Sequence, residues 1–405
     1  MVKAENNILI VSYYFAPNKI VGAKRISYLS HYLTELGFNV HVLTVKQKYN
    51  PLRDDSLPVS KKVYRVRMVP PYPMKKKTIF HKIFKVLWEK IASIDPYVGW
   101  TIPAIWQGLR IAKKHSINQI ICTGPPFSSF FIAYIISRIK HIKLILDYRD
   151  PWFLYLYEVK GLSRKFSIWI EEKILRHASK IVFNTEKAKS EYIKQKKIEN
   201  LEDKSVVIKN AFTNYNDLEP IILESNKKVI LYAGNFYGRR SLQYLIKPLH
   251  RLFDEKCLNK EDIAIHVFGK ITTRDRVLFS QNNFEHLINE HNKVNSNDVL
   301  RYMKGADVLY LPQGEDVPYS VAFKFYDYLS VKKPILVVTD KNSAMTEVMK
   351  EVDCGEVVDI NNTDEVYSAL KKILIEQKTY SFNGFENYSW EKISSKFSTL
   401  LNGKS

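Results

Sequence analysis

The chain has 405 residues, of which 45% are hydrophobic and 13% aromatic, as is typical of a packed globular protein rather than a disordered one. A single hydrophobic core rarely serves a chain of this length, so we expect two domains. The 62 Lys and Arg residues against 42 Asp and Glu give a formal net charge of +20, and no apolar run is long enough for a membrane-spanning helix.

Strands and helices alternate along the first half of the chain. Short apolar runs predict strands at 7–15, 39–45, 62–69, 119–124, 143–150, 180–185 and 206–212. Segments with helical spacing of apolar residues lie between them, at 22–37, 128–140 and 186–195. The run at 7–17 has no small-residue cleavage site, so it predicts a buried first strand rather than a secretory signal.

The second half of the chain repeats this alternation. Residues 214–227 are polar and contain Pro220, which predicts a linker. Strands are then predicted at 229–234, 263–269, 307–312, 334–338 and 355–360. Helices are predicted between them at 241–253, 297–306, 321–332 and 363–374, and a last helix at 387–401 has no following strand.

Continuous apolar strands separated by helices indicate the α/β class with parallel, doubly wound sheets. We therefore predict two Rossmann-like domains, at 1–213 and 228–386, joined by the linker 214–227. The two sheets should face each other across a cleft, because ligands bind such sheets at the carboxyl ends of the strands.

Cysteine and histidine usage indicates the compartment and the chemistry. The three cysteines, Cys122, Cys257 and Cys354, are far apart, which fits a reducing cytoplasm and argues against a disulfide framework or a cysteine zinc site. The ten histidines show no HxxxH or HExxH spacing, and the sequence has no DxD pair. We expect no metal and no cofactor.

The positive charge is concentrated in one half. Residues 1–220 carry 37 Lys and Arg against 18 Asp and Glu, whereas the remaining residues carry 25 against 24. This imbalance predicts that the first half meets a polyanion, either nucleic acid or an anionic membrane. The segment 75–92 is amphipathic, with six lysines beside an apolar face, and is typical of a helix that lies on a membrane surface. The alternative is a core-packing helix with a solvated basic side.

The stretch 321–338 raises the question of a ligand site. Lys324 and Asp327 lie three residues apart near the start of a predicted helix, after the polar loop 313–320. Their spacing fits a solvated ion pair, which would contribute only a few tenths of a kcal/mol. The alternative is an anion site at a helix N-terminus, where free N–H groups favour phosphate.

Two further groups of residues follow strands of the first half. Gly22 and Arg25 come after the first strand, where a glycine lets the backbone approach a phosphate. Asp147, Arg149 and Asp150 lie at the carboxyl end of another strand, where sites are built, and Asp150 could orient an acceptor hydroxyl. The alternatives are a turn glycine at position 22 and a charge network that holds the turn before Pro151.

Several motifs resemble the retaining glycosyltransferases of family 4, with the two-domain GT-B fold. Residues 12–44, 123–133 and 144–152 are similar to the opening elements of the bacterial surface-polysaccharide members. Residues 206–212 resemble the link between the two domains. Residues 233–246 resemble the phosphate-binding start of the second domain, and residues 304–312 and 324–338 resemble the donor-binding region. The last helix, from Tyr388 onward, resembles the family helix that packs back on the first domain.

This resemblance implies transfer of a sugar, of the hexosyl or N-acetylhexosaminyl type, from a nucleotide diphosphate sugar to a saccharide or lipid-linked acceptor, with retention of configuration. The enzyme would act in the cytoplasm, attached peripherally to the inner face of the membrane through 75–92. The residues implied to bind the donor are Gly234, Arg239, Arg240, Gly269, Ser320, Lys324 and Asp327. Arg239, Lys324 and Asp150 are implied to act in catalysis, and Gly22, Arg25, Asp147 and Arg149 to contact the acceptor or a phosphate.

The sequence departs from the family pattern at three positions. The ribose-binding glutamate is replaced by the shorter Asp327, the first glutamate of the family pair is replaced by Tyr319, and Phe127 stands where some relatives have histidine. Glu315 is close enough in sequence to substitute for the missing glutamate, with an exposed loop residue as the alternative.

Three other functions compete with this prediction. The departures leave open a pseudoenzyme that binds a nucleotide sugar and serves as a scaffold. A sugar-nucleotide epimerase shares the fold, but its histidine and acidic cluster is not evident. A nucleic-acid-binding protein would use the basic half, yet no RRM, KH or zinc-finger pattern is present, so we expect no nucleic acid partner.

Overall fold

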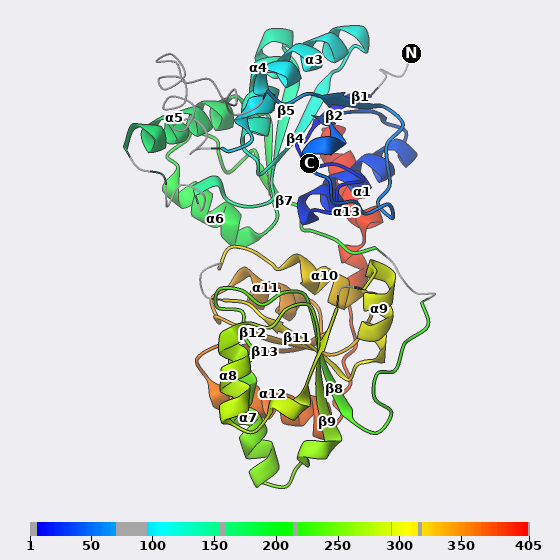
Figure 1. Cartoon of the computed structure of the whole chain (residues 1–405). Coiled ribbons are helices and arrows are strands. Elements are labelled where there is room, and N and C mark those ends of the chain that lie inside the picture. The colour runs from blue at the N-terminus through cyan, green and yellow to red at the C-terminus, as the bar shows by residue number, and fades with distance from the viewer. Residues whose placement is uncertain are drawn as a thin grey trace, which may run out of the picture. The chain divides into compact units, whose positions relative to one another are not determined.

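The structure is a computed structural model that describes residues 6–69, 95–153, 159, 161–213, 218–292, 294–314 and 318–403. The predicted membrane segment 75–92 and Glu315 lie outside these residues, as does the start of the predicted linker. The chain divides into two compact units, one made of Met1–Asn210 with Trp390–Ser405 and the other of Ala211–Ser389 (Figure 1). Each unit is described by itself.

The first unit is built on a parallel sheet of seven strands, in the order β3-β2-β1-β4-β5-β6-β7. The strands are β1 (Asn7–Val11), β2 (Asn39–Val45), β3 (Val63–Val66), β4 (Gln119–Gly124), β5 (Lys143–Tyr148), β6 (Lys180–Phe183) and β7 (Ser205–Val207). Every residue of β1 and β4 is buried, because helices cover both faces of the sheet. The sequence predicted all seven strands, although β1, β3 and β7 are each about four residues shorter than expected.

Six described helices surround this sheet: α1 (Val21–Glu35), α3 (Thr101–Lys114), α4 (Ser128–Lys140), α5 (Gly161–His177), α6 (Glu186–Gln195) and α13 (Trp390–Leu401). The sequence analysis did not identify α3 and α5. Helix α1 ends two residues before Gly37, which has a φ of +87° and so provides the left-handed residue that commonly terminates a helix.

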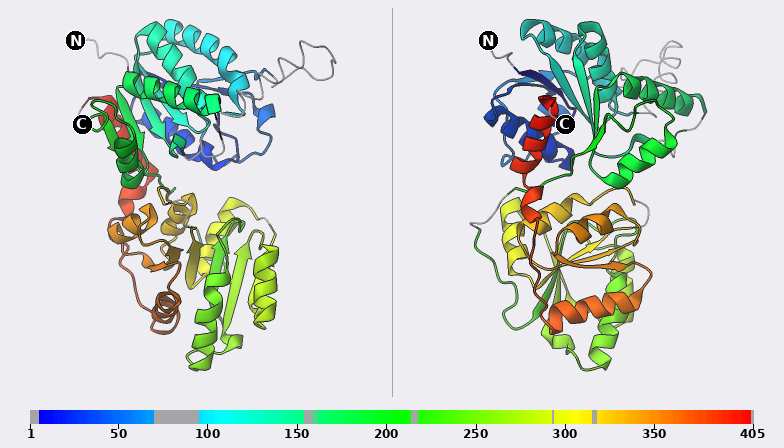
Figure 2. Two further views of the ribbon diagram at one scale, coloured as in Figure 1. Left: turned by 90° about the vertical axis from the view of Figure 1, so that its left-hand side faces the viewer. Right: turned by 180° about the vertical axis from the view of Figure 1, so that it is seen from behind.

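The last helix belongs to the first unit, although the whole second unit separates it in sequence. Helix α13 packs against α1, and the rings of Trp390 and Tyr28 stack with their centroids 5.4 Å apart. The Gln119 side-chain amide of β4 also donates a hydrogen bond of 3.1 Å to the Leu401 carbonyl. The views from the side and from behind in Figure 2 show α13, in red, against the blue α1.

The second unit contains a parallel sheet of six strands in the order β10-β9-β8-β11-β12-β13. The strands are β8 (Lys228–Ala233), β9 (Ile263–Phe268), β10 (Ile288–His291), β11 (Val308–Pro312), β12 (Ile335–Thr339) and β13 (Gly355–Asp359). Its helices are α7 (Gln243–Asp254), α8 (Thr273–Gln281), α9 (Ser296–Gly305), α10 (Phe323–Ser330), α11 (Ala344–Glu351) and α12 (Thr363–Leu370). Two Rossmann-like α/β units with parallel sheets therefore confirm the predicted fold class.

Side-chain alternation along the central strand separates two hydrophobic cores in this unit. Ile230 and Tyr232 of β8 join the core that includes α7 and α12, whereas Val229 and Leu231 join the core that includes α10 and α11. The sheet is thus buried on both faces, and its carboxyl edge is left for a site.

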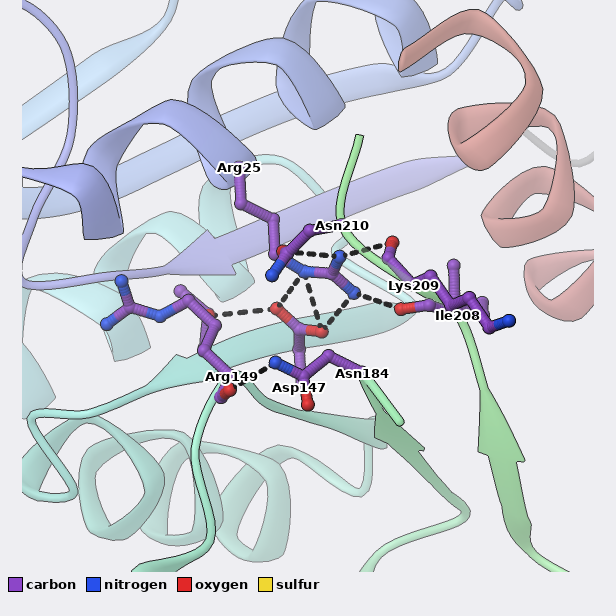
Figure 3. A network of polar contacts seen from close by, with 8 residues as sticks. Arg25, Asp147, Arg149, Asn184, Ile208, Lys209 and Asn210 are labelled. Carbon is purple, nitrogen blue, oxygen red and sulfur yellow. Dashed lines mark hydrogen bonds and ion pairs between the residues drawn. The ribbon is translucent and has the colours of Figure 1, made fainter. Parts of the chain in front are cut away.

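A buried ion pair joins the parts of the first unit (Figure 3). Arg25 of α1 is 1% exposed and Asp147 of β5 is fully buried, and the Arg25 Nη2 lies 2.8 Å from the Asp147 Oδ1. The Arg25 Nε also donates to Asp147, and its two Nη atoms donate to the carbonyls of Ile208 and Lys209 and to the Asn210 side chain. All five guanidinium N–H groups therefore have protein partners.

We expect Arg25→Ala and Asp147→Ala each to lower the free energy of unfolding of the first unit by about 3–5 kcal/mol, because each leaves a buried charge without its counter-ion. All six tryptophans lie in the first unit, so tryptophan fluorescence during urea unfolding reports on this unit alone. In the double variant Arg25→Met with Asp147→Leu, the free energy of unfolding should fall by less than the sum of the decreases in the two single variants.

The matched control is His31→Ala, because His31 is on the same helix but its side chain is 46% exposed. This variant should unfold within about 0.5 kcal/mol of the wild type. Single variants at Arg25 or Asp147 that are no less stable than the control would contradict the role of the ion pair.

Candidate functional site

Two glycines shape the carboxyl edge of the second sheet. Gly234 follows β8 with a φ of +134°, and Gly269 follows β9 with a φ of +156°. A Cβ at Gly269 would lie 2.1 Å from the Gly234 carbonyl oxygen, and a Cβ at Gly234 would lie 2.2 Å from the Lys324 Nζ. A side chain at either position would displace the backbone or the lysine, so both positions require glycine.

Lys324 lies in the first turn of α10 and extends toward this pair of glycines. Its Nζ donates a 2.5 Å hydrogen bond to the Tyr232 hydroxyl and lies 4.1 Å from the centre of the Tyr232 ring. Burial and, to a smaller extent, the nearby Arg240 lower the pKa of Lys324 from its usual 10.5 to about 7, against an opposing effect of Asp327. A cation that is partly stripped of water beside a second cation is well suited to bind an anion.

The loop before α10 is fixed by one buried side chain. The Gln313 side-chain amide donates 2.8 Å to the Ser320 carbonyl and accepts a 3.2 Å hydrogen bond from the Ala322 N–H. The helix begins at Phe323, two residues later than predicted. Asp327 of this helix and Tyr319 of the loop before it are both half-buried.

A cavity of about 260 Å³ lies at the same edge of the second unit. Its lining includes three arginines, of which Arg239 and Arg240 precede α7 and Arg274 is in the first turn of α8. The guanidinium of Arg240 lies 4.5 Å from the centre of the Tyr237 ring. The sequence analysis missed Arg274; its only signal is a basic residue in the first turn of a helix that follows a strand.

A buried carboxylate holds the two loops of this cavity together. Asp275 is fully buried and accepts hydrogen bonds from the Ser241 hydroxyl, from the Leu242 N–H at 3.2 Å and from the Thr272 hydroxyl at 2.8 Å. Ser241 lies in the β8–α7 loop and Thr272 caps α8, so the carboxylate fixes the segments that carry the three arginines.

The carboxyl edge of the first sheet holds the remaining predicted residues. A Cβ at Gly22 would lie 1.8 Å from the Arg149 Nη1. The absence of a side chain at this position therefore leaves room for the Arg149 guanidinium over the first turn of α1. The Arg149 Nη2 donates to the Pro125 carbonyl, and Asp150 beside it is half-buried.

Tyr14 and Tyr97, which the sequence analysis missed, lie near Arg149, with their ring centroids 5.8 Å apart. Burial raises the pKa of Tyr14, and Tyr97 raises it further, so the hydroxyl stays protonated and remains a hydrogen-bond donor at neutral pH.

Two predicted ligand-binding residues have a different place in the structure. Arg25 and Asp147 were expected to contact the acceptor or a phosphate, but both are buried and bind each other and the backbone after β7. No guanidinium N–H of Arg25 is left for a ligand, so these two residues form a buried ion pair across the unit, which differs from the local network before Pro151 that the sequence left open as the alternative.

Metal and membrane features were sought in the described part of the chain. Within it, no cluster of three or more His, Cys, Asp or Glu residues has a geometry that could hold a metal ion. None of its helices is long and apolar enough to cross a membrane.

Family models match most of the chain. Residues 22–212 match the model described as Glycosyltransferase Family 4, and residues 227–376 match the model described as Glycosyl transferases group 1. The chain belongs to the family-4-like glycosyltransferases. The resemblance drawn from the short motifs is thereby confirmed. No curated protein matches the chain as a whole.

Solved structures of this GT-B fold match over nearly the whole chain. The sucrose-phosphate synthase from Thermosynechococcus elongatus has 14% identity and a TM-score of 0.67 and covers 98% of both chains. HepE from Anabaena, in complex with UDP and glucose, has 12% identity and a TM-score of 0.63, over 98% of this chain and 99% of that one. The lipopolysaccharide outer core galactosyltransferase WaaB has 13% identity and a TM-score of 0.61, over 98% and 100%.

The lowered pKa of Lys324 predicts a pH dependence of stability. Between pH 7 and 10.5 the unfolded chain binds a proton on this lysine that the folded glycosyltransferase does not, so this group makes the free energy of unfolding rise with pH. Below about pH 7 both states are protonated and the full cost of burying the charge is present. Lys324→Met should therefore stabilise the protein most near neutral pH, and this gain should shrink toward pH 10.5.

Circular dichroism during urea unfolding at several pH values in this range measures the effect. The control is Lys350→Met, because Lys350 is exposed on α11 of the same unit. A difference between Lys324→Met and wild type that does not change with pH would contradict the lowered pKa.

Proposed function

We propose that this glycosyltransferase transfers a hexosyl or N-acetylhexosaminyl group from a nucleotide diphosphate sugar to a saccharide acceptor, with retention of configuration. The observation that carries the proposal is the juxtaposition of Lys324 and Arg240, two cations close enough that Arg240 lowers the pKa of Lys324. Their mutual repulsion is relieved when a diphosphate binds between or beside them. Arg239 and Arg274 in the adjoining cavity add positive charge for the same anion.

The reaction needs stabilisation of a leaving group more than a strong base. The bond between the anomeric carbon and the diphosphate oxygen breaks, the bond to the acceptor oxygen forms, and the acceptor proton passes to the departing diphosphate. Negative charge grows on the diphosphate, so Lys324, Arg239 and Arg240 are the groups expected to lower the barrier. Asp150 is proposed to orient the acceptor hydroxyl.

The donor is proposed to lie along the loops of the second unit. Gly234 and Gly269 leave room for it beside the backbone, Ser320 lies in the loop before α10, and Asp327 is proposed to accept hydrogen bonds from the ribose hydroxyls. Anabaena HepE binds UDP and UDP-glucose, and its similarity to this chain makes a uridine nucleotide the first donor to test.

The acceptor is proposed to contact the carboxyl edge of the first sheet, where Arg149, Asp150, Tyr14 and Tyr97 lie. We propose that it is a lipid-linked saccharide of a cell-surface polysaccharide and that the enzyme works in the cytoplasm at the inner face of the membrane. The basic segment 75–92 is proposed to contribute to membrane attachment, with no role for nucleic acid.

The cation site predicts which substitutions weaken nucleotide binding. We expect Lys324→Ala, Arg239→Ala and Arg240→Ala each to weaken UDP binding about 10–100-fold, because each removes a charge-assisted contact of about 1.5–3 kcal/mol. Isothermal titration calorimetry with UDP, and with GDP if UDP does not bind, measures the effect. Arg276→Ala is the control, because Arg276 is on α8 close to the cavity but pairs with Glu290. Unchanged affinity in all three variants would remove the site assignment.

Turnover distinguishes the enzyme from its alternatives. With UDP-sugar and a lipid-linked saccharide acceptor, the wild type should release UDP and form a new glycosidic bond, detected by chromatography. Nucleotide binding without release, over a panel of sugars, would favour the scaffold; conversion of the nucleotide sugar without acceptor would favour an epimerase.

The role of Asp327 is tested by changing its charge and its length separately. Asp327→Asn should weaken nucleotide binding about 5–10-fold, because replacing a charge-assisted hydrogen bond by a neutral one loses about 1–1.5 kcal/mol. Asp327→Glu should bind at least as well as wild type if the short side chain only compromises a family-like geometry, and worse if the loop before α10 has rebuilt the pocket around Asp.

Calorimetric affinities for Asn, Glu and wild type decide between these results. If Asp327 merely pairs with Lys324 on the helix surface, Asp327→Asn changes stability by a few tenths of a kcal/mol and leaves nucleotide affinity unchanged. Equal affinities across the three proteins would therefore end the ribose assignment.

A further inference from the structure

Exposed hydrophobic side chains gather on three neighbouring helices of the first unit. Ile102 and Trp106 of α3, Ile139 of α4, and Leu162, Phe166 and Trp169 of α5 are between 48% and 84% exposed. The described tryptophans elsewhere, Trp100, Trp152 and Trp390, are at most 3% exposed. Indole rings left in water beside other apolar side chains indicate a surface that meets a partner.

The three helices form one layer. Helix α3 packs on α4 and α4 packs on α5, while α3 covers β2 and β3 and α4 covers β1, β4 and β5. Figure 1 shows α3 and α4 side by side, with α5 beyond them. On α5 the exposed residues 162, 166 and 169 recur every three or four positions, as do 102 and 106 on α3, so each set forms a stripe along the outer side of its helix.

The charge on these helices is almost entirely positive. They carry nine basic residues: Arg110, Lys113, Lys114, Arg138, Lys140, Arg164, Lys165, Lys173 and Arg176. Their only acidic residues are Glu171 and Glu172, and Glu171 is buried and bound to Lys196 at 2.7 Å. The outer side of the layer therefore offers cations with a single accompanying carboxylate.

Each exposed tryptophan is paired with a cation on its own stripe. The Arg110 guanidinium lies 4.4 Å from the centre of the Trp106 ring, and the Lys173 ammonium lies 4.2 Å from the centre of the Trp169 ring. An indole with a cation one turn away suits the boundary of a bilayer, because the ring is stable among the headgroups while the cation contacts lipid phosphates.

We propose that the outer side of α3, α4 and α5, here called the docking face, binds an anionic lipid membrane. A nucleic acid would match the charge but would leave Ile102, Ile139 and Leu162 in water, whereas a bilayer accommodates both the apolar and the basic side chains. The docking face contains no residue of segment 75–92, and it deepens the proposed function, on which it rests only for the view that the acceptor is lipid-linked.

The arrangement along the helices relates the membrane to the acceptor. Helices α4 and α5 begin after the carboxyl ends of β4 and β5, so their first turns lie at the edge that carries Arg149 and Asp150. On α3 the exposed apolar residues lie in the first half and the basic ones in the second, whereas on α5 Arg164 and Lys165 lie beside Leu162 and Phe166 in the first half. The first turns of α3 and α5 therefore bring exposed apolar side chains close to the acceptor edge, where a lipid-linked saccharide would have a short path from a bilayer on this face.

Vesicle co-sedimentation of the full chain tests the docking face. Wild type should sediment with vesicles of phosphatidylcholine and phosphatidylglycerol, and much less with phosphatidylcholine alone. Trp106→Gln with Trp169→Gln should lower the partition coefficient about tenfold or more, because the two rings supply interfacial burial. The control pair is Ile222→Gln with Val277→Gln, which replaces exposed apolar side chains of the second unit that are 59% and 49% exposed.

Three results would overturn the proposal. The tryptophan double variant could bind vesicles as well as wild type, the control double variant could lose as much vesicle binding as the tryptophan variant, or wild type could be a dimer that the same two tryptophan changes dissociate.

The triple variant Lys75→Gln, Lys76→Gln and Lys77→Gln measures the contribution of the basic segment separately. In that background the two tryptophan changes should weaken vesicle binding further. UDP affinity, measured in parallel, should not change with the tryptophan pair; a wild type that sediments without binding UDP would defeat the proposed function and leave the docking face intact.

Discussion

The ion pair between Arg25 and Asp147 is the constraint on which the first unit depends. A carboxylate buried near the carboxyl end of a parallel strand is very costly without a counter-ion, and the arginine that neutralises it comes from α1. The same guanidinium holds the backbone just after β7, so one side chain connects the first helix, the central sheet and the segment where the chain leaves the unit. The position of that exit, and with it the start of the second unit, is tied to the centre of the first sheet.

The second unit uses buried charge for a different end. The Lys324 side chain is largely removed from water. Its ammonium group nevertheless donates a hydrogen bond to the Tyr232 hydroxyl rather than to a carboxylate. The opposing charge of Asp327 is too weak an influence to restore the usual pKa of the lysine. The first unit thus buries a charge that its own residues compensate, whereas the second retains one whose compensation we propose a ligand completes.

Sequence patterns predicted every described strand except β10, because buried parallel strands are short continuous apolar runs, whereas β10 (Ile288–His291) is mostly polar and only partly buried. They were weaker for α5, where Lys and Arg residues interrupt the stripe and exposed Leu162 and Phe166 obscure which side is buried. The residues of the candidate sites were likewise predicted in part. Gly234 and Gly269 were implied by the family resemblance and Lys324 was noted near the start of a predicted helix, and the structure brings the three together.

Other site features depend on contacts that spacing does not encode. Arg25 and Asp147 are separated by 122 positions, so no local pattern showed that they would neutralise each other. Arg274 lines the cavity from the first turn of α8, which the buried Asp275 ties to the β8–α7 loop, and Tyr97 contacts Tyr14, which lies 83 positions earlier in the sequence. Whether a charged residue serves the fold or a ligand was decided in each case by its three-dimensional neighbours.

The place of α13 has a consequence for biosynthesis. The second unit is continuous in sequence, from Ala211 to Ser389, whereas the first is completed only by residues that follow it. On the ribosome the side of α1 that carries Tyr28 stays uncovered until the whole second unit has been made, because its partner Trp390 is translated afterwards. The second unit can therefore finish folding before the first, and a nascent or truncated chain that stops before α13 presents an unsealed apolar groove to chaperones and proteases.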